Sequence, residues 1–597
     1  NRNFLLAGAG MGTIDFPEEM YPMSEGFIGV DQAPHVRVLL LQHDIKTAIV
    51  AVEQVNTPAD VIDAIKEQIA QRTGTPKGNI WVSSTHAFCT PHAPTDAENL
   101  ARFNAAVLSA AEEAIDQASD DLQYAKIGIA ETTCDINVNH ERKVGEKWID
   151  STPNPDRPSD KTVTIVKVQS LEGNDIGLMF SYGIRSSAAD APRGNNERLI
   201  TPDLSGEASL ALEKAYGVPA LFLNSAAADQ MPKEAGLWNK VSEDGSTSEQ
   251  IWNGIEAGLA AAKKMGSELA AAVKGAVDTM ECIGKGEITH YAGSFNWDNT
   301  TGDAQINVPV ETITIDGLAM AAVKTELCAE TALALREASP YENTIALTFV
   351  NGDQSYMPAA STYDEGTKVS TKSSLKRGAA EEFIRVAVQM MNGELERTNI
   401  DDAQGREEGI SYEGTDAESV GQIINIGGLE WQVLAEVDGK QLVITKDVIN
   451  VGPFNKEGGN CIWENSSVRD SLNGEFLNRF TDAEKARIQE TVNQNKANST
   501  YAAGAGADTT DRIFLLSMDE AAGYFADKAA RVAIDPETGN TTTWWLRTTG
   551  KDTAFAATIL TDGSIYAHGN LAGEADSSQS GDTYEASGVR PAMWIVK

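Results

Sequence analysis

The segment VRVLLLQ, residues 36–42, is followed closely by TAIVAVE, residues 47–53, and both are typical of buried strands. The next segment, ADVIDAIKEQIAQRTG at 59–74, has the periodicity of an amphipathic helix, and NIWVSST at 79–85 is typical of a third strand. A second, longer helix is expected after it. This alternation of strands and helices predicts an α/β fold for the first part of the chain.

We expect the chain to divide into domains where its composition changes from periodic and apolar to polar and acidic. Its 597 residues exceed the size at which one hydrophobic core stops growing, so we expect more than one domain. The run GELERTNIDDAQGREEGISYEGTDAE, residues 393–418, is polar, acidic and without periodicity. We therefore predict a multidomain chain with an α/β domain over 1–395, a linker over 396–417 and an α+β domain over 418–597.

The chain is strongly acidic, with 87 acidic and 48 basic residues and a formal net charge of −39. This charge repels nucleic acid and anionic membrane surfaces, so we expect no nucleic-acid partner. No apolar run approaches the roughly 20 residues of a spanning helix, so no transmembrane segment is predicted. The opening residues NRNFLLAG lack methionine. We expect a secreted or cell-surface protein from which a signal or anchor segment has been removed.

The segment SSTHAFCTPHAP, residues 83–94, contains two of the seven histidines and one of the five cysteines. His86 follows a predicted strand and precedes a helix, the position where open α/β sheets gather ligand-binding groups. The cysteines are widely spaced and include no CxxC pair, so they predict neither a disulfide framework nor a cysteine zinc site. Buried free thiols are the ordinary interpretation of these cysteines, and Cys89 could act as a nucleophile only if His86 or His92 served as its base.

Six segments of the first domain, in order, resemble the N-terminal domain of the neutral/alkaline ceramidase family. GTIDFP resembles the opening strand of that domain, and SSTHAF resembles its STHTH loop. The later matches are NPDRPSDKTVTIVKV, LITPDLSGEASLALEKAYGVPALFLNSAAADQMP, TELCAETA and NGDQSYMPAASTYDEG. Members of this family are secreted zinc amidases that cleave the amide of a sphingolipid, so the resemblance implies their fold.

In that family two histidines, a glutamate and a tyrosine hold the zinc ion. The resemblance implies that His86, Glu326 and Tyr356 correspond to three of these ligands. The position of the second histidine holds Arg185, which stays protonated and cannot donate to a metal.

Two further positions depart from the family pattern. Phe88 replaces the second histidine of the STHTH loop, and the serine nucleophile of the ceramidases falls on Ala226, with Ser225 one position away. We therefore expect a retained fold with a relict site and no stoichiometric zinc. Arg185 is predicted to lie within salt-bridge distance of Glu326, so that the carboxylate keeps a counter-charge.

An alternative stays open at this stage. If His92 or another residue supplied the missing ligand, the first domain would bind zinc and hydrolyse an amide or ester.

The second domain resembles a bacterial family of C-type-lectin fold, related to the formylglycine-generating-enzyme type. The matching segments are CIWENSSVRDSLNGEFLNRFTDAEKARI, DRIFLLSMDEA, TTTWWLRTTG and GVRPAMWIVK. Domains of this fold include the variable proteins of diversity-generating retroelements, which display a binding surface near the C-terminus. The resemblance implies a scaffold with a ligand-binding face.

The scaffold motifs predict that Trp544, Arg547, Arg590 and Trp594 are largely buried. The polar segments between them, 551–553, 566–570 and 576–585, are expected to be exposed and to converge on one face, although ordinary solvated loops would have the same composition. The candidate ligand-binding residues are Lys551, Thr553, Tyr566, His568, Asn570 and Tyr584.

Together these observations predict a secreted or cell-surface ligand-binding protein. The second domain would bind a protein or glycan ligand, and the first would serve as a non-catalytic scaffold without a cofactor. The alternative is a zinc-dependent amide or ester hydrolase that the lectin-fold domain delivers to its target.

Overall fold

The computed structural model describes residues 4–43, 45–393, 400–401, 412–457, 462–498, 503–550, 552–573 and 587–597. The chain forms two compact units, Asn1–Asn392 and Gly393–Lys597. The division lies close to residue 395, where the sequence predicts the first domain to end.

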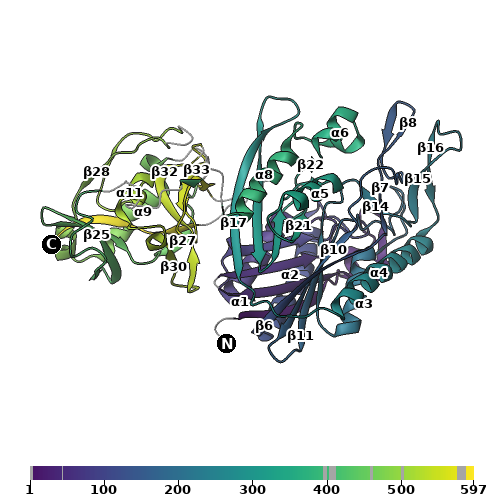
Figure 1. Ribbon diagram of the computed structural model, residues 1–597, viewed down its shortest axis with the longest axis horizontal. Helices are drawn as coiled ribbons and strands as arrows, with labels where there is room; N and C mark the ends of the chain where they lie inside the picture. Colours follow the sequence, from purple (N-terminus) through teal and green to yellow (C-terminus); the bar gives the residue numbers. More distant parts are fainter. Residues whose placement is uncertain are drawn as a thin grey trace. The chain divides into compact units, whose positions relative to one another are not determined.

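The first unit is built on an eight-stranded sheet in the order β13-β11-β10-β6-β1-β3-β4-β5 (Figure 1). Its strands are β1 (Leu5–Thr13), β3 (His35–Gln42), β4 (Lys46–Val52), β5 (Ile80–Ser84), β6 (Gln123–Thr133), β10 (Thr162–Ser170), β11 (Asp175–Tyr182) and β13 (Ala220–Asn224). Strands β4 and β5 pair in parallel, as do β11 and β13, whereas the other neighbours are antiparallel. The strands and the helix expected between residues 36 and 85 are present, the helix as α1 (Ala59–Thr73).

A second sheet, in the order β17-β18-β19-β21, packs on one face of the first. Its strands are β17 (Ile288–Asp298), β18 (Gln305–Ile315), β19 (Leu318–Ala322) and β21 (Asn343–Leu347). Leu39 and Leu41 of β3 point into the core between the two sheets, and Val38 and Leu40 point into the core beneath the helices. Side chains alternate across a strand, so β3 is buried on both faces.

Helices cover the outer faces of both sheets (Figure 1). Those on the eight-stranded sheet are α1, α2 (Ala97–Asp120), α3 (Asp203–Tyr216) and α4 (Ile255–Val277). Those on the second sheet are α5 (Ala329–Ala338) and α8 (Ala379–Met391). The unit is thus a four-layer α/β/β/α arrangement, with the short helices α6 (Ala360–Glu365) and α7 (Lys368–Lys372) beside it.

Short strands lie outside the two sheets. They are β2 (Phe27–Val30), β7 (Asn137–Asn139), β8 (Arg142–Val144), β9 (Lys147–Ile149), β12 (Arg198–Ile200), β14 (Gln230–Pro232), β15 (Leu237–Val241), β16 (Ser248–Trp252), β20 (Glu326–Leu327) and β22 (Tyr356–Met357). They pair with one another as β2 with β12, β7 with β14, β8 with β9, β15 with β16 and β20 with β22.

The second unit contains a six-stranded sheet, β23-β34-β33-β32-β35-β27, and a four-stranded sheet, β24-β25-β26-β36. The first comprises β23 (Ile400–Asp401), β27 (Asn450–Gly452), β32 (Trp544–Thr549), β33 (Phe555–Ile559), β34 (Ile565–Leu571) and β35 (Ser587–Val589). The second comprises β24 (Ile423–Ile426), β25 (Leu429–Val437), β26 (Lys440–Thr445) and β36 (Ala592–Val596). The remaining elements are α9 (Ser467–Asn473), α10 (Asp482–Arg487), α11 (Met518–Tyr524), β28 (Thr491–Asn493), β29 (Thr509–Asp511), β30 (Ala533–Asp535) and β31 (Asn540–Thr542).

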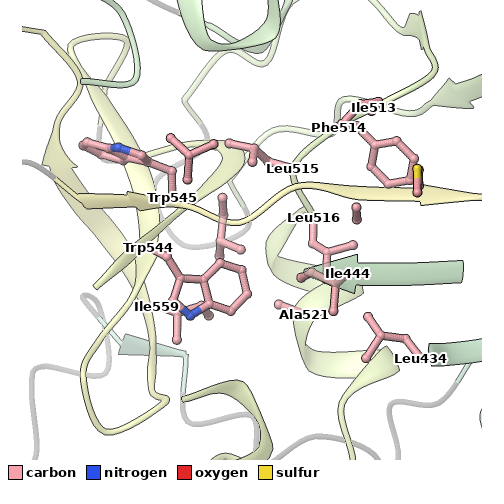
Figure 2. Packing of buried hydrophobic residues seen from close by; sticks show 14 of the residues in the cluster. Leu434, Ile444, Ile513, Phe514, Leu515, Leu516, Ala521, Trp544, Trp545 and Ile559 are labelled. Atoms are coloured by element: carbon pink, nitrogen blue, oxygen red, sulfur yellow. The ribbon is translucent and has the colours of Figure 1, made fainter. Parts of the chain in front are cut away.

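Tryptophans fill the core of this unit. Figure 2 shows Trp544 and Ile559 in one cluster with Leu516 and Ile444, which come from other elements. The Arg590 guanidinium lies over Trp544, 5.0 Å from the ring centroid, and donates to the backbone carbonyls of Thr445, Lys446 and Arg531. The expected burial of Trp544, Arg547 and Arg590 is confirmed, whereas Trp594 is only partly buried.

Part of the predicted linker belongs to the second unit. Ile400 and Asp401 add strand β23 to β34, and the Tyr412 ring stacks on Tyr524 with 4.6 Å between centroids. The rest of the span up to residue 411 lies outside the described residues. Among the described residues, no helix has the length and apolar character needed to cross a membrane.

Strand β1 packs against helix α2 without intervening side chains. A Cβ atom built on Gly10 would lie 2.1 Å from the Ala114 carbonyl oxygen, and Gly8 and Gly12 face Ala118 and Ala110 at similar distances. Glycine is therefore required along this face of β1, because any side chain would force the helix away from the sheet.

We predict that Gly10→Ala lowers the free energy of unfolding by about 2 kcal/mol, because the helix backbone cannot move aside cheaply. Gly29→Ala in β2 is the matched control, since its nearest neighbour would be the Leu199 Cδ2 atom at 3.7 Å. Denaturant unfolding of both variants measures the difference. Equal stability of the two variants would contradict the close packing.

Candidate functional site

The His86 loop leaves the end of β5 and is held by backbone hydrogen bonds. The Thr85 amide donates to the Val52 carbonyl, and the Ala87 amide donates to the Gln54 carbonyl. His86 itself has φ of +58°, a conformation rare for residues other than glycine. Its Nδ1 atom lies 2.5 Å from the Val55 carbonyl oxygen, so the backbone of the β4 terminus fixes the ring.

The structure brings His86 together with Glu326 and Tyr356. The His86 Nε2 atom lies 3.1 Å from Glu326 Oε1, and the two side chains are 15% and 13% exposed. Glu326 and Tyr356 are direct partners in the short parallel pairing of β20 and β22. Residues that are far apart in the sequence therefore meet at one place in the unit.

The hydrogen bonds define the protonation state of this pair. Because a carbonyl only accepts, Nδ1 of His86 donates to Val55, and Nε2 then donates to the carboxylate of Glu326. An imidazolium makes both bonds. Burial raises the pKa of Glu326, but the hydrogen bond and charge of His86, with help from Arg185 and Tyr356, lower it below its ordinary value overall. The pKa of the Tyr356 hydroxyl is raised by burial and by the charge of Glu326.

Arg185 lies beside this pair but does not form the expected salt bridge. Among the described residues, no carboxylate lies within ion-pair distance of its guanidinium. Its Nη2 atom instead donates to the Ala228 carbonyl oxygen at 3.3 Å, and the guanidinium lies 5.2 Å from the centroid of the Phe88 ring. The prediction of a direct Arg185–Glu326 bond is wrong, because the guanidinium is bonded to the Ala228 carbonyl instead and acts on Glu326 only through its charge.

His140 is a buried neighbour that the sequence did not single out. Its Nε2 atom donates to the same Ala228 carbonyl at 2.9 Å, and its Nδ1 accepts from the Ser151 amide. Burial and the charge of Arg185 lower the pKa of His140 to about 3, so the ring is neutral. No local sequence motif marks this residue, because its role depends on a carbonyl that lies 88 residues further along the chain.

The neighbouring candidates do not complete a hydrolytic site. The Ser225 hydroxyl is buried and donates to the Ala346 carbonyl at 2.7 Å, and Ala226 is buried next to it. His92 pairs with Glu25, with 2.5 Å between Nδ1 and Oε1, and does not contact Glu326. Within the part of the chain that the structure describes, no three histidine, cysteine, aspartate or glutamate side chains gather closely enough to hold a metal.

The donor set does not fit zinc. Protein zinc sites use at least three ligands, typically histidine, cysteine or carboxylate side chains. Here His86 and Glu326 are joined by a proton, Tyr356 has a raised pKa, and Arg185 adds a permanent positive charge nearby.

Comparison with known proteins agrees with this fold. The chain resembles neutral ceramidase from Pseudomonas aeruginosa, with 12% identity, a TM-score of 0.50, and coverage of 75% of this chain and 84% of that one. A ceramidase complexed with C2 matches at 11% identity and a TM-score of 0.52, over 85% of this chain and 89% of that one. The first unit has a ceramidase-like fold.

Residues 438–597 match a family described as "Domain of unknown function (DUF6273)". A search of curated proteins finds no match. At these identities the similarity of the ceramidase-like unit is a similarity of fold alone.

The predicted ligand-binding residues of the second unit are placed differently from expectation. Tyr566 and Asn570 are buried in β34, which lies between β23 and β33, and Asn570 donates to the Ser587 hydroxyl at 3.1 Å. The expectation that they are exposed is wrong, because both side chains are packed inside the unit and not on a solvated face of the sheet. Thr553 is half-buried in the turn before β33.

The other candidates cannot be compared with the prediction. Lys551, Tyr584 and the whole of 576–585 lie outside the described residues, as does the side chain of His568.

The second unit does contain a polar hollow of about 230 Å³, lined in part by Tyr412, Lys496 and Asp519. At its base Arg547 donates to the Leu515 carbonyl at 2.9 Å and to Glu520 Oε1 at 2.8 Å. Arg547 also donates to the Asn495 side chain. Its guanidinium is therefore committed to holding loops together.

We predict that the His86–Glu326 pair makes the ceramidase-like unit sensitive to acid. Because folding lowers the pKa of Glu326 from its ordinary value of 4.5, its stabilising effect is present above pH 4.5 and is lost as pH falls through the lower folded value. Glu326→Gln should lower the free energy of unfolding by about 3 kcal/mol at pH 7. The difference from the natural protein should shrink below pH 4.5.

Denaturant unfolding between pH 3 and 7, about the range in which carboxylates titrate, measures this dependence. Glu25→Gln is the control, because its pair with His92 is far more exposed and should contribute little. A pH-independent difference between Glu326→Gln and the natural protein would contradict the ion pair.

Tyr566→Ala is expected to destabilise the second unit by about 3 kcal/mol, since it empties a fully buried ring site. Tyr566→Phe keeps the ring and should lose much less. Thermal unfolding followed by near-ultraviolet circular dichroism compares the two variants. An unchanged melting temperature for Tyr566→Ala would show that the side chain is exposed after all.

Proposed function

We propose that this protein is a secreted or cell-surface ligand-binding protein whose ceramidase-like unit binds without hydrolysing amides. The observation that carries the proposal is Arg185, a permanent cation beside His86, Glu326 and Tyr356. These are the residues that correspond to the zinc ligands of the ceramidases, and Arg185 occupies the position of the fourth.

The surroundings of Arg185 support this proposal. Hydrolysis of an amide needs an activated water or nucleophile, and a metal that polarises the carbonyl. Ser225 is bonded to a backbone carbonyl and His140 is buried and neutral, so neither is arranged as a nucleophile and base. The pair His86–Glu326 is self-neutralised, which is a stable arrangement for two buried charges without a metal.

For the second unit we propose a C-type-lectin-like scaffold that displays a recognition site for a protein or glycan. Its buried tryptophans, its arginines bonded to carbonyls, and the pairing of the C-terminal strand β36 with β26 support a scaffold that holds irregular loops. Since Tyr566 and Asn570 are buried, the recognition residues would be those of the hollow near Tyr412 and Lys496, together with the predicted candidates that lie outside the described residues.

Zinc content tests the proposal directly. The purified protein is expected to contain well below one zinc per chain after dialysis and to release no fatty acid from a ceramide. Arg185→His should gain zinc affinity, because it supplies a second histidine beside His86, Glu326 and Tyr356. Elemental analysis of both proteins, incubated with equal zinc, measures the gain.

Arg157→His is the control for this gain, because Arg157 lies over Trp148 and is paired with Glu365 on the surface. One zinc per chain in the natural protein, together with amide hydrolysis, would overturn the proposal in favour of a zinc-dependent hydrolase.

A further inference from the structure

We propose that Arg185 and Phe88 of the ceramidase-like unit bind the carboxylate and the apolar part of a monocarboxylate ligand. The inference rests on the proposed function. If no catalytic metal is present, Arg185 supplies the positive charge that attracts an anionic ligand.

Arg185 has N–H donors that no group in the described part of the protein accepts. Of its guanidinium N–H groups, Nη2 donates to the Ala228 carbonyl, and no other acceptor within the described part of the chain takes up the rest. None of its nitrogen atoms is among the buried polar atoms without a partner, so the remaining donors face solvent. A planar guanidinium with solvent-facing donors matches the two oxygens of a carboxylate.

Other arginines of the same unit that lie over aromatic rings lack this freedom. Arg157 lies over Trp148 but donates to both oxygens of Glu365, and Arg198 lies over Phe27 but pairs with Asp190 at 3.1 Å. Arg185 is thus distinguished by its lack of a carboxylate partner, and a ligand can supply one.

Aromatic groups beside Arg185 provide an apolar contact. The half-buried Phe88 ring lies under the guanidinium and contacts the His86 ring edge to face, with 4.9 Å between centroids. Phe349 stacks on the His86 ring, with 4.2 Å between centroids. A ligand whose carboxylate reaches Arg185 would place its adjoining carbon atoms next to Phe88.

The local charges favour a single negative charge on the ligand. The charges of His86 and Glu326 neutralise each other, and no carboxylate of the described residues is in ion-pair contact with Arg185, although Asp150 and Asp190 are close enough for their charges to act on it. Asp353 lies near Glu326 and His86 and would repel a second negative charge. A dianionic phosphate would therefore be less well matched than a carboxylate, particularly on a chain with a net charge of −39.

Benzoate is the probe for this site, and benzamide, which has the same shape without the charge, is its control. Binding to the full chain at pH 7 is measured by isothermal titration calorimetry and by saturation-transfer NMR, after dialysis against a chelator. Benzoate is expected to bind and benzamide to bind at least about tenfold more weakly, because the charge-assisted hydrogen bonds are lost.

Two variants assign the binding to Arg185. Arg185→Gln should weaken benzoate binding about tenfold or more, and Arg157→Gln should leave it unchanged, since Arg157 is already paired with Glu365. Thermal unfolding shows whether each variant is folded. If Arg185→Gln does not fold, Arg185→Lys, which keeps the charge but loses the planar fork, should bind benzoate more weakly than the natural protein.

The outcomes separate this inference from the proposed function. Failure of benzoate to bind at millimolar concentration, equal binding of benzoate and benzamide, or unchanged binding in Arg185→Gln would each overturn the inference while leaving a non-hydrolytic unit intact. Benzoate binding that disappears with the chelator and returns with zinc would instead overturn the proposed function.

Discussion

A fully buried arginine organises the ceramidase-like unit. The Arg37 guanidinium is bonded to Glu53 at 2.8 Å and to Glu213 of α3 at 2.8 Å; the Arg37 and Glu53 side chains are 1% exposed and that of Glu213 is 11% exposed. An unpaired charge at this depth would cost several kcal/mol, by the order of magnitude found for buried ion pairs that lose one partner. Strand β3, the end of β4 and helix α3 are therefore fixed with respect to one another.

The candidate site depends on this network. Glu53 directly follows β4 and also accepts the His35 amide, so the chain direction after β4 is determined there. The carbonyls of Gln54 and Val55, the next residues, hold the His86 loop. Gly206 allows helix α3 to approach Glu53 closely, since a Cβ atom there would lie 2.3 Å from a carboxylate oxygen of Glu53.

At the candidate site, as around Arg37 in the core, protein groups stabilise each charged side chain, but the kinds of group differ. Glu326 is matched by His86, whereas Arg185 is stabilised by a carbonyl and an aromatic face and keeps its charge toward solvent. This contrast is the basis on which we propose a site without a metal and an anion as the ligand of Arg185. The neutral His140 beneath Arg185 avoids a second buried positive charge.

The sequence by itself determined the strands and the helix between residues 36 and 85, because strong apolar periodicity is a local property, and it placed His86, Glu326 and Tyr356 in one site through their motifs. Only the tertiary structure decided which partner each charge takes. His86 contacts Glu326 because the Val55 carbonyl fixes the ring, Arg185 bonds to the Ala228 carbonyl instead, and Tyr566 is packed inside the second unit although its segment is polar. The glycines of β1 carry no apolar signal, and their purpose becomes visible only when α2 lies against them.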